Sequence, residues 1–343
     1  MPFSRSLLLA AAVLAASPLA LAAQTLIVLN KSDAQASLVD IASARVVATI
    51  LTGDGPHEVA VSPDGKTAVV GNYGGPTPGN SLTIIDLPRR AVSRTISLGE
   101  NRRPHGIVWL PDGERVLVTV EQNQAVLIVD VGKGIVTHTM PTASNGTHMV
   151  ALSPNGKFAY TANIGSGSVT RLDLDAGKAV QTVITGKGPE AIDVSPDGRE
   201  VWAADRTLDY ITVLGAGQLD SLASMPTLRF PNRLKFTLDG KRVLVSNAAA
   251  GAITVYDVSQ RKLIKTIPIP FDASKKRAEA VLGDMDNSAV PLGILLEPGG
   301  KRAWVATAAL GEVVELDLEK LSISRTIHAG NNPDGMAYIP RLP

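Results

Sequence analysis

The chain has 343 residues, with 33 Lys and Arg against 32 Asp and Glu, so its formal net charge is +1. This balance lacks the basic excess of a nucleic-acid-binding domain, and we expect no nucleic-acid partner. The sequence contains no cysteine, which excludes disulfides, a cysteine-linked lipid, c-type haem attachment and a thiol nucleophile. The composition of 31 Gly, 22 Pro and only 4% aromatic residues favours a globular fold of short strands joined by tight turns.

The first element in chain order is a short apolar segment. Arg5 precedes an apolar run from Leu7 to Leu14, and small residues follow at Ala20 to Ala23. This order is typical of a secretory signal, and the run is too short to cross a bilayer. We therefore predict a signal peptide over residues 1–23, export to the periplasm, and a mature chain 24–343 without a membrane span.

Seven copies of one repeat follow. Their first residues lie 42 to 60 positions apart and are His57, His105, His148, Glu190, Asn232, Leu292 and Asp334. The first four copies contain Pro-Asp-Gly or Pro-Asn-Gly, in which Pro presets an early turn position and Gly tolerates a positive φ later. Three more alternating runs complete a unit, such as Thr67 to Asn72, Ser81 to Asp86 and Val92 to Ser97. Four short strands per unit predict one blade of a β-propeller.

The two ends of the chain complete the count of blades. The last copy has only its first strand, Asp334 to Ile339, whereas the segment after the leader offers Thr25 to Asn30, Ser37 to Asp40 and Arg45 to Ile50. Joining them predicts an all-β, seven-bladed propeller whose ring is closed by a C-terminal inner strand beside three N-terminal strands. Such closure hides sheet edges.

Two stretches resemble a known repeat. GPHEVAVSPDGKTAVVGN, from Gly55, and PNGKFAYTANIGSGSVTRLD, from Pro154, are similar to the YVTN-type β-propeller repeat of periplasmic and surface-layer proteins, and the resemblance covers essentially the whole mature chain. It implies a seven-bladed propeller. It does not choose a chemistry, because similar propellers include quinoprotein dehydrogenases, lactonases and antibiotic lyases.

The residues that open the inner strands are expected to surround one mouth of the central channel. Three of the five histidines in the chain, His57, His105 and His148, occupy this position in successive copies, and Glu190 occupies it in the next. Imidazole and carboxylate groups bind zinc, and imidazole also suits copper and iron. We predict that these four residues hold a transition metal ion. Two alternatives stay open: each residue caps its own blade, or the four together hold an organic or anionic ligand.

Further residues are expected to contact a small ligand at the same mouth. Asn232 and Asp334 belong to the ring of strand-opening residues, whereas Tyr73, Glu121 and Arg206 follow the second strands of their units. Arg206 suits a carboxylate on the ligand. These five residues complete the predicted ligand-binding set.

An insertion interrupts the repeat before Leu292. Residues 270–290 lengthen this connection, which joins an outer strand to the next inner strand and is therefore expected on the mouth face. A long ordered connection is often a lid or binding loop, although a passive surface loop is an equal alternative. Ser274 is expected to cap a short helix from Lys275 onward.

The pattern predicts a binding protein rather than an enzyme. No Gly-x-Ser-x-Gly, His-Glu-x-x-His or phosphate-binding glycine loop is present, and these are the contiguous motifs of common hydrolases and nucleotide enzymes. We predict an exported, non-catalytic propeller that binds a metal ion, a small ligand or a periplasmic partner protein at the mouth. The alternative is a lactonase-like hydrolase or lyase that uses a histidine as base and Glu190 as acid.

Overall fold

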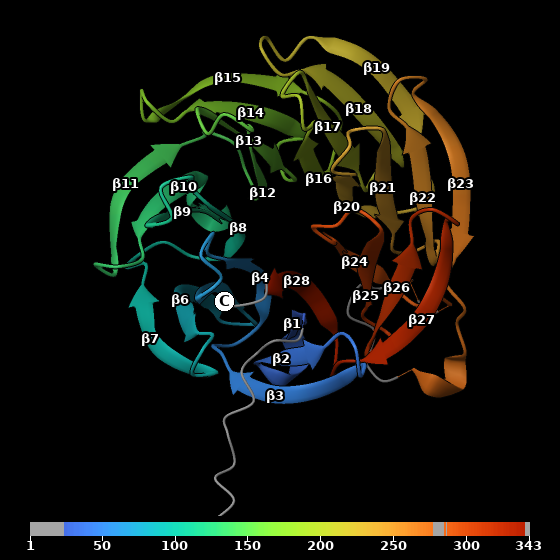
Figure 1. Ribbon diagram of the computed structural model, residues 1–343. Helices are drawn as coiled ribbons and strands as arrows, with labels where there is room; N and C mark the ends of the chain where they lie inside the picture. The colour runs from blue at the N-terminus through green and yellow to red at the C-terminus, as the bar shows by residue number, and fades with distance from the viewer. Residues whose placement is uncertain (1–23, 277–284, 286, 340–343) are drawn as a thin grey trace, which may run out of the picture.

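The protein folds as a ring of β-sheets around a central opening (Figure 1). The computed structural model describes residues 24–276, 285 and 287–339. In this part of the chain seven four-stranded antiparallel sheets form, each with its first strand at the axis and its last strand at the rim. The prediction of an all-β, seven-bladed propeller is confirmed. The predicted signal peptide, residues 1–23, lies outside the described residues.

The strands follow one order in every blade, from the inner strand to the outer strand. Blade 1 contains β4 (Pro56–Val61), β5 (Thr67–Gly74), β6 (Pro78–Asp86) and β7 (Ala91–Ser97), and blade 2 contains β8 (Pro104–Trp109), β9 (Arg115–Val120), β10 (Ala125–Asp130) and β11 (Ile135–Pro141). Blade 3 contains β12 (Thr147–Leu152), β13 (Phe158–Asn163), β14 (Ser168–Asp173) and β15 (Lys178–Ile184), and blade 4 contains β16 (Pro189–Val194), β17 (Glu200–Asp205), β18 (Tyr210–Gly215) and β19 (Ser221–Pro226).

The remaining blades repeat this arrangement. Blade 5 contains β20 (Pro231–Phe236), β21 (Arg242–Asn247), β22 (Ala252–Asp257) and β23 (Lys262–Pro268), and blade 6 contains β24 (Pro291–Leu296), β25 (Arg302–Thr307), β26 (Glu312–Asp317) and β27 (Ser322–His328). Blade 7 joins the two ends of the chain as β28 (Pro333–Ile339), β1 (Thr25–Asn30), β2 (Gln35–Asp40) and β3 (Arg45–Leu51). β1 pairs antiparallel with β28, with Thr25 opposite Ile339, which confirms the predicted closure of the ring.

Apolar side chains pack between neighbouring blades. One core cluster joins Leu244 and Val255 of blade 5 to Val305 and Leu316 of blade 6. Alternation along each strand places one set of side chains on each sheet face, so every blade contributes to two such layers. Burial of apolar area between the blades is therefore the main source of stability.

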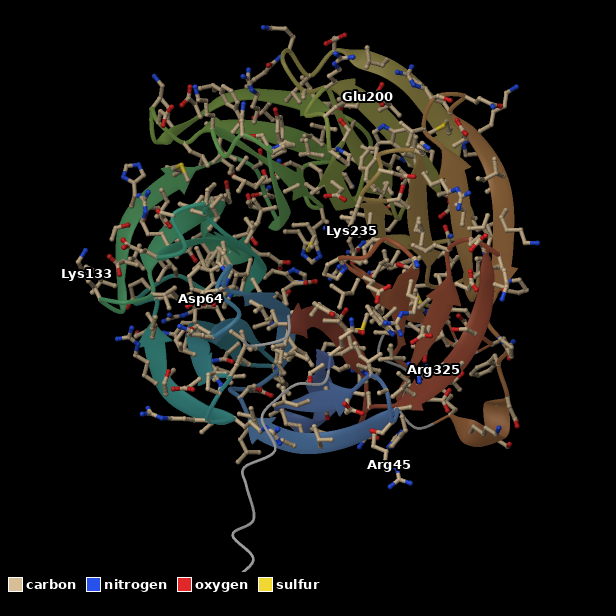
Figure 2. All side chains as sticks on the ribbon, in the orientation of Figure 1. Arg45, Asp64, Lys133, Glu200, Lys235 and Arg325 are labelled. Atoms are coloured by element: carbon tan, nitrogen blue, oxygen red, sulfur yellow. The ribbon has the colours of Figure 1, made fainter. Side chains whose placement is uncertain are left out.

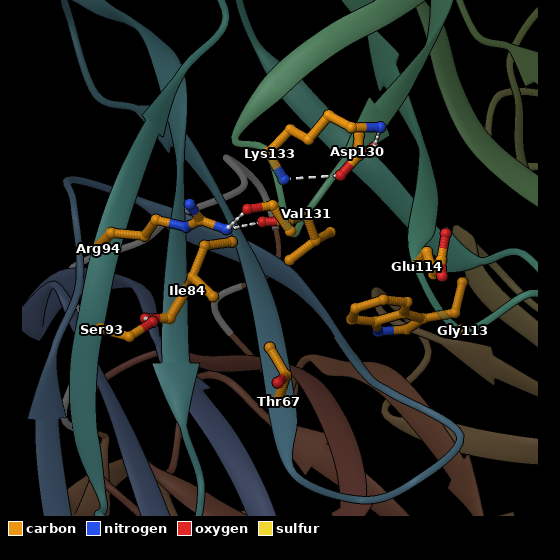
Figure 3. Close-up of a pocket in the computed structure, with 11 residues that line it drawn as sticks. Thr67, Ile84, Ser93, Arg94, Gly113, Glu114, Asp130, Val131 and Lys133 are labelled. Carbon is orange, nitrogen blue, oxygen red and sulfur yellow. Dashed lines mark hydrogen bonds and ion pairs between the residues drawn. The ribbon is translucent and has the colours of Figure 1, made fainter.

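Arginine side chains form hydrogen bonds between neighbouring blades on the face opposite the mouth. Arg94 of β7 donates to the carbonyls of Val131 and Gly132 in the next blade (Figure 3). Three arginines repeat this contact across other junctions, namely Arg171 to Gly217, Arg242 to Leu318 and Arg325 to Ile41. The pocket of about 700 Å³ around Arg94 lies at such a junction. Since similar pockets recur at two further junctions, we regard them as a product of the repeat.

The described ends of the insertion pack against loops that follow second strands. Met285, Val290 and Leu292 form an apolar cluster with Ala248 and Ala308. A 3₁₀-helix spans Ala273–Lys275, and the carboxylate of Asp272 accepts from the Ser274 amide. The prediction that Ser274 caps a helix from Lys275 onward was wrong, because the preceding aspartate reaches the free amide instead. Most of residues 277–286 lie outside the described residues.

Candidate functional site

A β-bulge in every inner strand determines which side chains face the channel mouth. In β4, Pro56 pairs with Asn72 but Val59 pairs with Val70, so the inner strand carries one extra residue. The register shifts at the equivalent position of the other six inner strands, β8, β12, β16, β20, β24 and β28. A bulge re-aims side chains locally. It falls at the position of His57 and its six equivalents, which we call the mouth residues.

Hydroxyl groups on second strands hold this bulge in place in two blades. Thr119 Oγ1 accepts from the Gly106 amide at 2.8 Å and donates to the carbonyl of His148 in the next blade. Ser246 does the same in blade 5, between the Arg233 amide at 3.0 Å and the Leu292 carbonyl at 2.7 Å. Each hydroxyl therefore links the bulge of its own inner strand to the mouth residue of the following blade.

The three predicted histidines lie beside one another. The ring centroids of His57 and His105 are 5.2 Å apart, and those of His105 and His148 are 3.7 Å apart. Tyr73 packs 4.3 Å from His57 and 5.5 Å from His105. His57 Nδ1 contacts the Gly55 carbonyl at 2.8 Å, whereas His105 and His148 are buried.

Two glutamates flank His148. Its Nδ1 donates to Glu121, which also accepts from the Tyr73 hydroxyl at 2.7 Å. Its Nε2 lies 3.6 Å from Glu190 Oε1. His148 thus connects a loop of blade 2 to the inner strand of blade 4.

Glu190 is the most heavily engaged carboxylate of the mouth. It accepts from Arg206 at 2.5 Å and from Asn232 Nδ2 at 2.5 Å, and Arg233 Nη1 lies 3.4 Å away. With His148 on the other side, two guanidinium groups, one amide and one imidazole surround it. This set of partners suits a structural carboxylate whose charge is already matched.

A second ionic group lies on the other side of the mouth. Asp334 accepts from Lys31 Nζ at 2.9 Å, and its other oxygen, Oδ1, lies 3.9 Å from Arg233. Arg233 also donates to Glu58 at 2.6 Å. Because Arg233 belongs to blade 5 and Glu58 to blade 1, this ion pair spans the channel.

Burial and charge divide the histidines into two protonation states. Burial disfavours the imidazolium of His148, but Glu121 and Glu190 outweigh this effect and raise its pKa to about 9. Burial likewise opposes ionisation of Glu190, yet His148 and the neighbouring arginines lower its pKa to about 2.

Burial, together with the positive charge of Lys31, lowers the pKa of His57 to about 3. Burial and the charge of His148 hold the pKa of His105 well below its usual range. Of the three histidines at the mouth, only His148 is therefore cationic at neutral pH.

Among the described residues, one group has the composition and spacing for a metal ion. His105, Glu121 and His148 each offer one ligand atom, and these atoms lie within 4.8 Å of one another. In the described part of the chain, the buried Nδ1 of His105 has no hydrogen-bond partner, and Nε2 of His148 has its ion-pair contact with Glu190 at 3.6 Å. Two histidines and one carboxylate are typical of catalytic zinc and of non-haem iron sites. The group shares His105 and His148 with the predicted set and replaces His57 and Glu190 by Glu121.

The structure brings the predicted ligand residues to the same mouth. Tyr73 bonds to Glu121, Arg206 and Asn232 bond to Glu190, and Asp334 lies across the opening beside Lys31. Their roles toward a ligand stay predictions.

Lys31 and Glu58 were missed by the sequence reasoning. Glu58 immediately follows a mouth residue, and alternation along a regular strand would place it on the opposite face, so the sequence pattern offered no signal for it.

Three comparisons place the chain among known proteins. A family model described as a seven-bladed β-propeller lactonase matches residues 104–267. Hydrazine synthase subunit beta of Kuenenia stuttgartiensis is 27% identical over 162 residues, which cover 40% of this chain and 42% of that relative. The match thus spans less than half the length of the curated relative.

Solved structures extend the likeness to most of the ring. The hydrazine synthase of Kuenenia stuttgartiensis superposes with a TM-score of 0.69 at 18% identity, over 82% of this chain and 88% of that one. A functionally unknown protein from Desulfotomaculum acetoxidans superposes with a TM-score of 0.74 at 17% identity, over 92% and 98%. The chain therefore shares the seven-bladed β-propeller fold of these proteins. At these identities the solved structures show the fold of the chain alone.

No helix in the described part of the propeller is long and apolar enough to cross a membrane.

Proposed function

We propose that this propeller is an exported binding protein whose mouth holds a transition metal ion between His105, Glu121 and His148. The supporting observation is that His105, Glu121 and His148 each offer a ligand atom within 4.8 Å of one another, and that the buried His105 Nδ1 has no hydrogen-bond partner among the described residues. A buried polar atom without a partner costs free energy. A bound cation would coordinate His105 Nδ1 and would displace the proton of the His148 imidazolium. Zinc and iron suit this donor set, and copper also accepts imidazole.

The periplasmic location is part of this proposal. It rests on the predicted leader over residues 1–23. Cell fractionation tests it: the chain should leave the cytoplasm and lose its first residues, and deletion of residues 1–23 should retain it inside.

Metal titration of the chelator-treated protein tests the site. Zinc or cobalt should bind at one ion per chain, and cobalt should give a visible spectrum characteristic of nitrogen and oxygen ligands. His105→Ala, Glu121→Gln and His148→Ala should each weaken binding by at least about tenfold, which corresponds to about 1.4 kcal/mol. His138→Ala is the matched control, because His138 lies on the outer strand of blade 2 and contacts the Gly177 carbonyl. Absence of stoichiometric metal, or equal loss in the control, would sink the proposal.

A further variant separates the alternative metal sets. If His57 is a ligand, then His57→Ala should weaken binding as strongly as His105→Ala does. If the set is His105, Glu121 and His148, then His57→Ala should leave the affinity nearly unchanged.

A lactonase-like hydrolase is the second candidate function. The lactonase model matches residues 104–267, which include His105, Glu121, His148 and Glu190. Neutral His105 has the protonation state of a general base, whereas the low pKa of Glu190 opposes its use as an acid at neutral pH. Screening the purified protein against lactones tests this candidate. Turnover that His105→Ala abolishes would favour the enzyme over the binding protein.

Binding of a partner protein at the mouth is the remaining alternative within this proposal. The relative from Kuenenia stuttgartiensis is named as a subunit of hydrazine synthase, and a related surface on this chain would use the mouth loops. Co-purification from periplasm, with and without the Arg206→Ala change, tests for such a partner.

A further inference from the structure

The central channel contains a second compartment beyond the mouth. A pocket of about 320 Å³ is lined by the residues that follow the mouth residues along the inner strands, including Glu58, Met149, Asp193, Arg233, Lys235 and Met336. These positions lie progressively deeper in the ring, because each inner strand runs from the mouth toward the opposite face. We call this space the lower channel.

The ion pair between Arg233 and Glu58 separates the lower channel from the metal site. Arg233 is buried and donates through Nε and Nη2 to Glu58 Oε1, at 3.1 Å and 2.6 Å. Its Nη1 donates to Asn232 at the mouth. The guanidinium therefore forms a partition across the axis, with the mouth on one side and the lower channel on the other.

One cation of the lower channel keeps its hydrogen-bonding capacity. Lys235 Nζ lies 3.5 Å from Asp193 Oδ1, which is beyond the usual range of about 2.7–3.2 Å for an N–H···O bond. The other oxygen of Asp193, Oδ2, accepts from the Phe236 amide at 3.0 Å. Figure 2 places Lys235 at the inner rim of the ring, whereas Arg45 and Lys133 lie at its outer edge. The ammonium thus forms an ion pair with Asp193 and keeps further N–H donors for a ligand in the channel.

One acceptor lies at the partition. Both bonds from Arg233 end on Glu58 Oε1, and among the described residues no hydrogen bond to Oε2 is found. Ile107, Met149, Ile294 and Met336 contribute apolar side chains to the same walls. The lower channel therefore combines apolar side chains with a cation, Lys235, and a hydrogen-bond acceptor, Glu58 Oε2.

We propose that the lower channel binds a small amphipathic carboxylic acid that carries a hydrogen-bond donor at its other end. The carboxylate pairs with Lys235, the apolar body contacts the two methionines, and a hydroxyl or ammonium group donates to Glu58. The volume is near the low end of the range of about 300–1,000 Å³ for ligand pockets, which restricts the occupant to about the size of one substituted ring.

The test uses 3-(4-hydroxyphenyl)propanoate as a probe and methionine methyl groups as reporters. With methyl-¹³C methionine in the full chain, the probe should shift the resonances of Met149 and Met336 saturably. It should leave those of Met140 and Met225 unchanged, because both are buried within the blades, in other core clusters. No saturable shift, or equal shifts of all four, would overturn the proposal.

Variants and analogues then test each contact. Lys235→Met should weaken the probe by at least about tenfold, and the methyl ester of the probe should lose as much. Lys241→Met is the matched control, because Lys241 is exposed in the β20–β21 turn of the same blade. 3-Phenylpropanoate, which lacks the hydroxyl, should bind several-fold more weakly. Equal affinity of acid and ester, or of Lys235→Met and the unmodified protein, would contradict the assignment.

The probe also distinguishes this site from the metal site. His105→Ala removes a proposed metal ligand and should leave the affinity for the probe unchanged, whereas Lys235→Met should leave metal binding unchanged. Loss of binding at one site therefore does not imply loss of binding at the other.

Discussion

His148 bridges two glutamates from different blades: its Nδ1 is hydrogen-bonded to Glu121, and its Nε2 lies 3.6 Å from Glu190 Oε1. Both carboxylates are largely buried, with side-chain exposures of 11% and 5%. A buried ion pair contributes little net free energy, but removal of one partner leaves the other charge uncompensated. The mouth is therefore sensitive to single changes of charge.

Glu190→Gln should destabilise the protein strongly. The change leaves His148, Arg206 and Arg233 around a neutral amide, and loss of one partner from a buried ionic group costs about 3–5 kcal/mol. Urea unfolding followed by tryptophan fluorescence measures this loss. Glu100→Gln is the control, because the side chain of Glu100 is 97% exposed, and its effect should stay within about 0.5 kcal/mol. Equal unfolding midpoints for the two variants would contradict the prediction.

The same interaction should make the stability of the metal-free protein depend on pH. The pKa of His148 is raised from 6.5 to about 9, so its contribution is fully present below pH 6.5 and is lost as the pH rises through about 9. The pKa of Glu190 is lowered from 4.5 to about 2, so its contribution is present above pH 4.5 and is lost as the pH falls through about 2. Both contributions are therefore fully present only between pH 4.5 and pH 6.5.

Comparison with His148→Gln isolates this effect. The difference in free energy of unfolding between the unmodified protein and the variant should be largest between pH 4.5 and 6.5, the unfolded-state values of the two groups. It should shrink as the pH rises toward 9. Chelator-treated protein and denaturant unfolding at several pH values provide the measurement. A difference that grows above pH 6.5 would refute the assigned charge of His148.

Gly335→Ala should destabilise the junction between the closing blade and blade 1. A Cβ at this position would lie 2.2 Å from the carbonyl oxygen of His57, and the backbone cannot move away without disturbing the mouth. Overpacking of this kind costs about 1–3 kcal/mol. Gly217→Ala, where a Cβ would meet nothing within 4 Å, is the control in thermal unfolding. A Gly335→Ala protein as stable as this control would show that the blades can separate freely.

The sequence was sufficient to predict the ring but not the full mouth. The repeat and the incomplete copies at the two ends predict seven blades, because each unit must bury its faces against its neighbours. The position of His57, His105 and His148 in the repeat also predicts that they meet. This part of the site follows from periodicity alone.

The bulge explains what periodicity could not predict. In a regular strand, neighbouring residues point to opposite faces, so Glu58 would not be expected to reach the channel beside His57. The extra residue in β4 removes this restriction, and Glu58 meets Arg233, 175 positions away in the sequence. Glu121 was predicted from its loop, but its bond to His148 depends on the packing of blade 2 against blade 3. Such contacts between residues far apart in the sequence leave no local sequence pattern from which they could be predicted.

Thr119→Val should weaken the mouth through the bulge rather than through a change of charge. Valine preserves the shape of threonine but removes the hydroxyl that accepts from the Gly106 amide and donates to the His148 carbonyl. Both backbone groups then lie buried without partners, at a cost of about 1–3 kcal/mol. Because His148 is held through this carbonyl, we also expect weaker metal binding at unchanged net charge. Thr95→Val, at an exposed position of β7, should change neither stability nor affinity, and urea unfolding with metal titration of both variants checks the prediction. If Thr119→Val loses stability but keeps full metal affinity, then the bulge stabilises the ring without positioning His148.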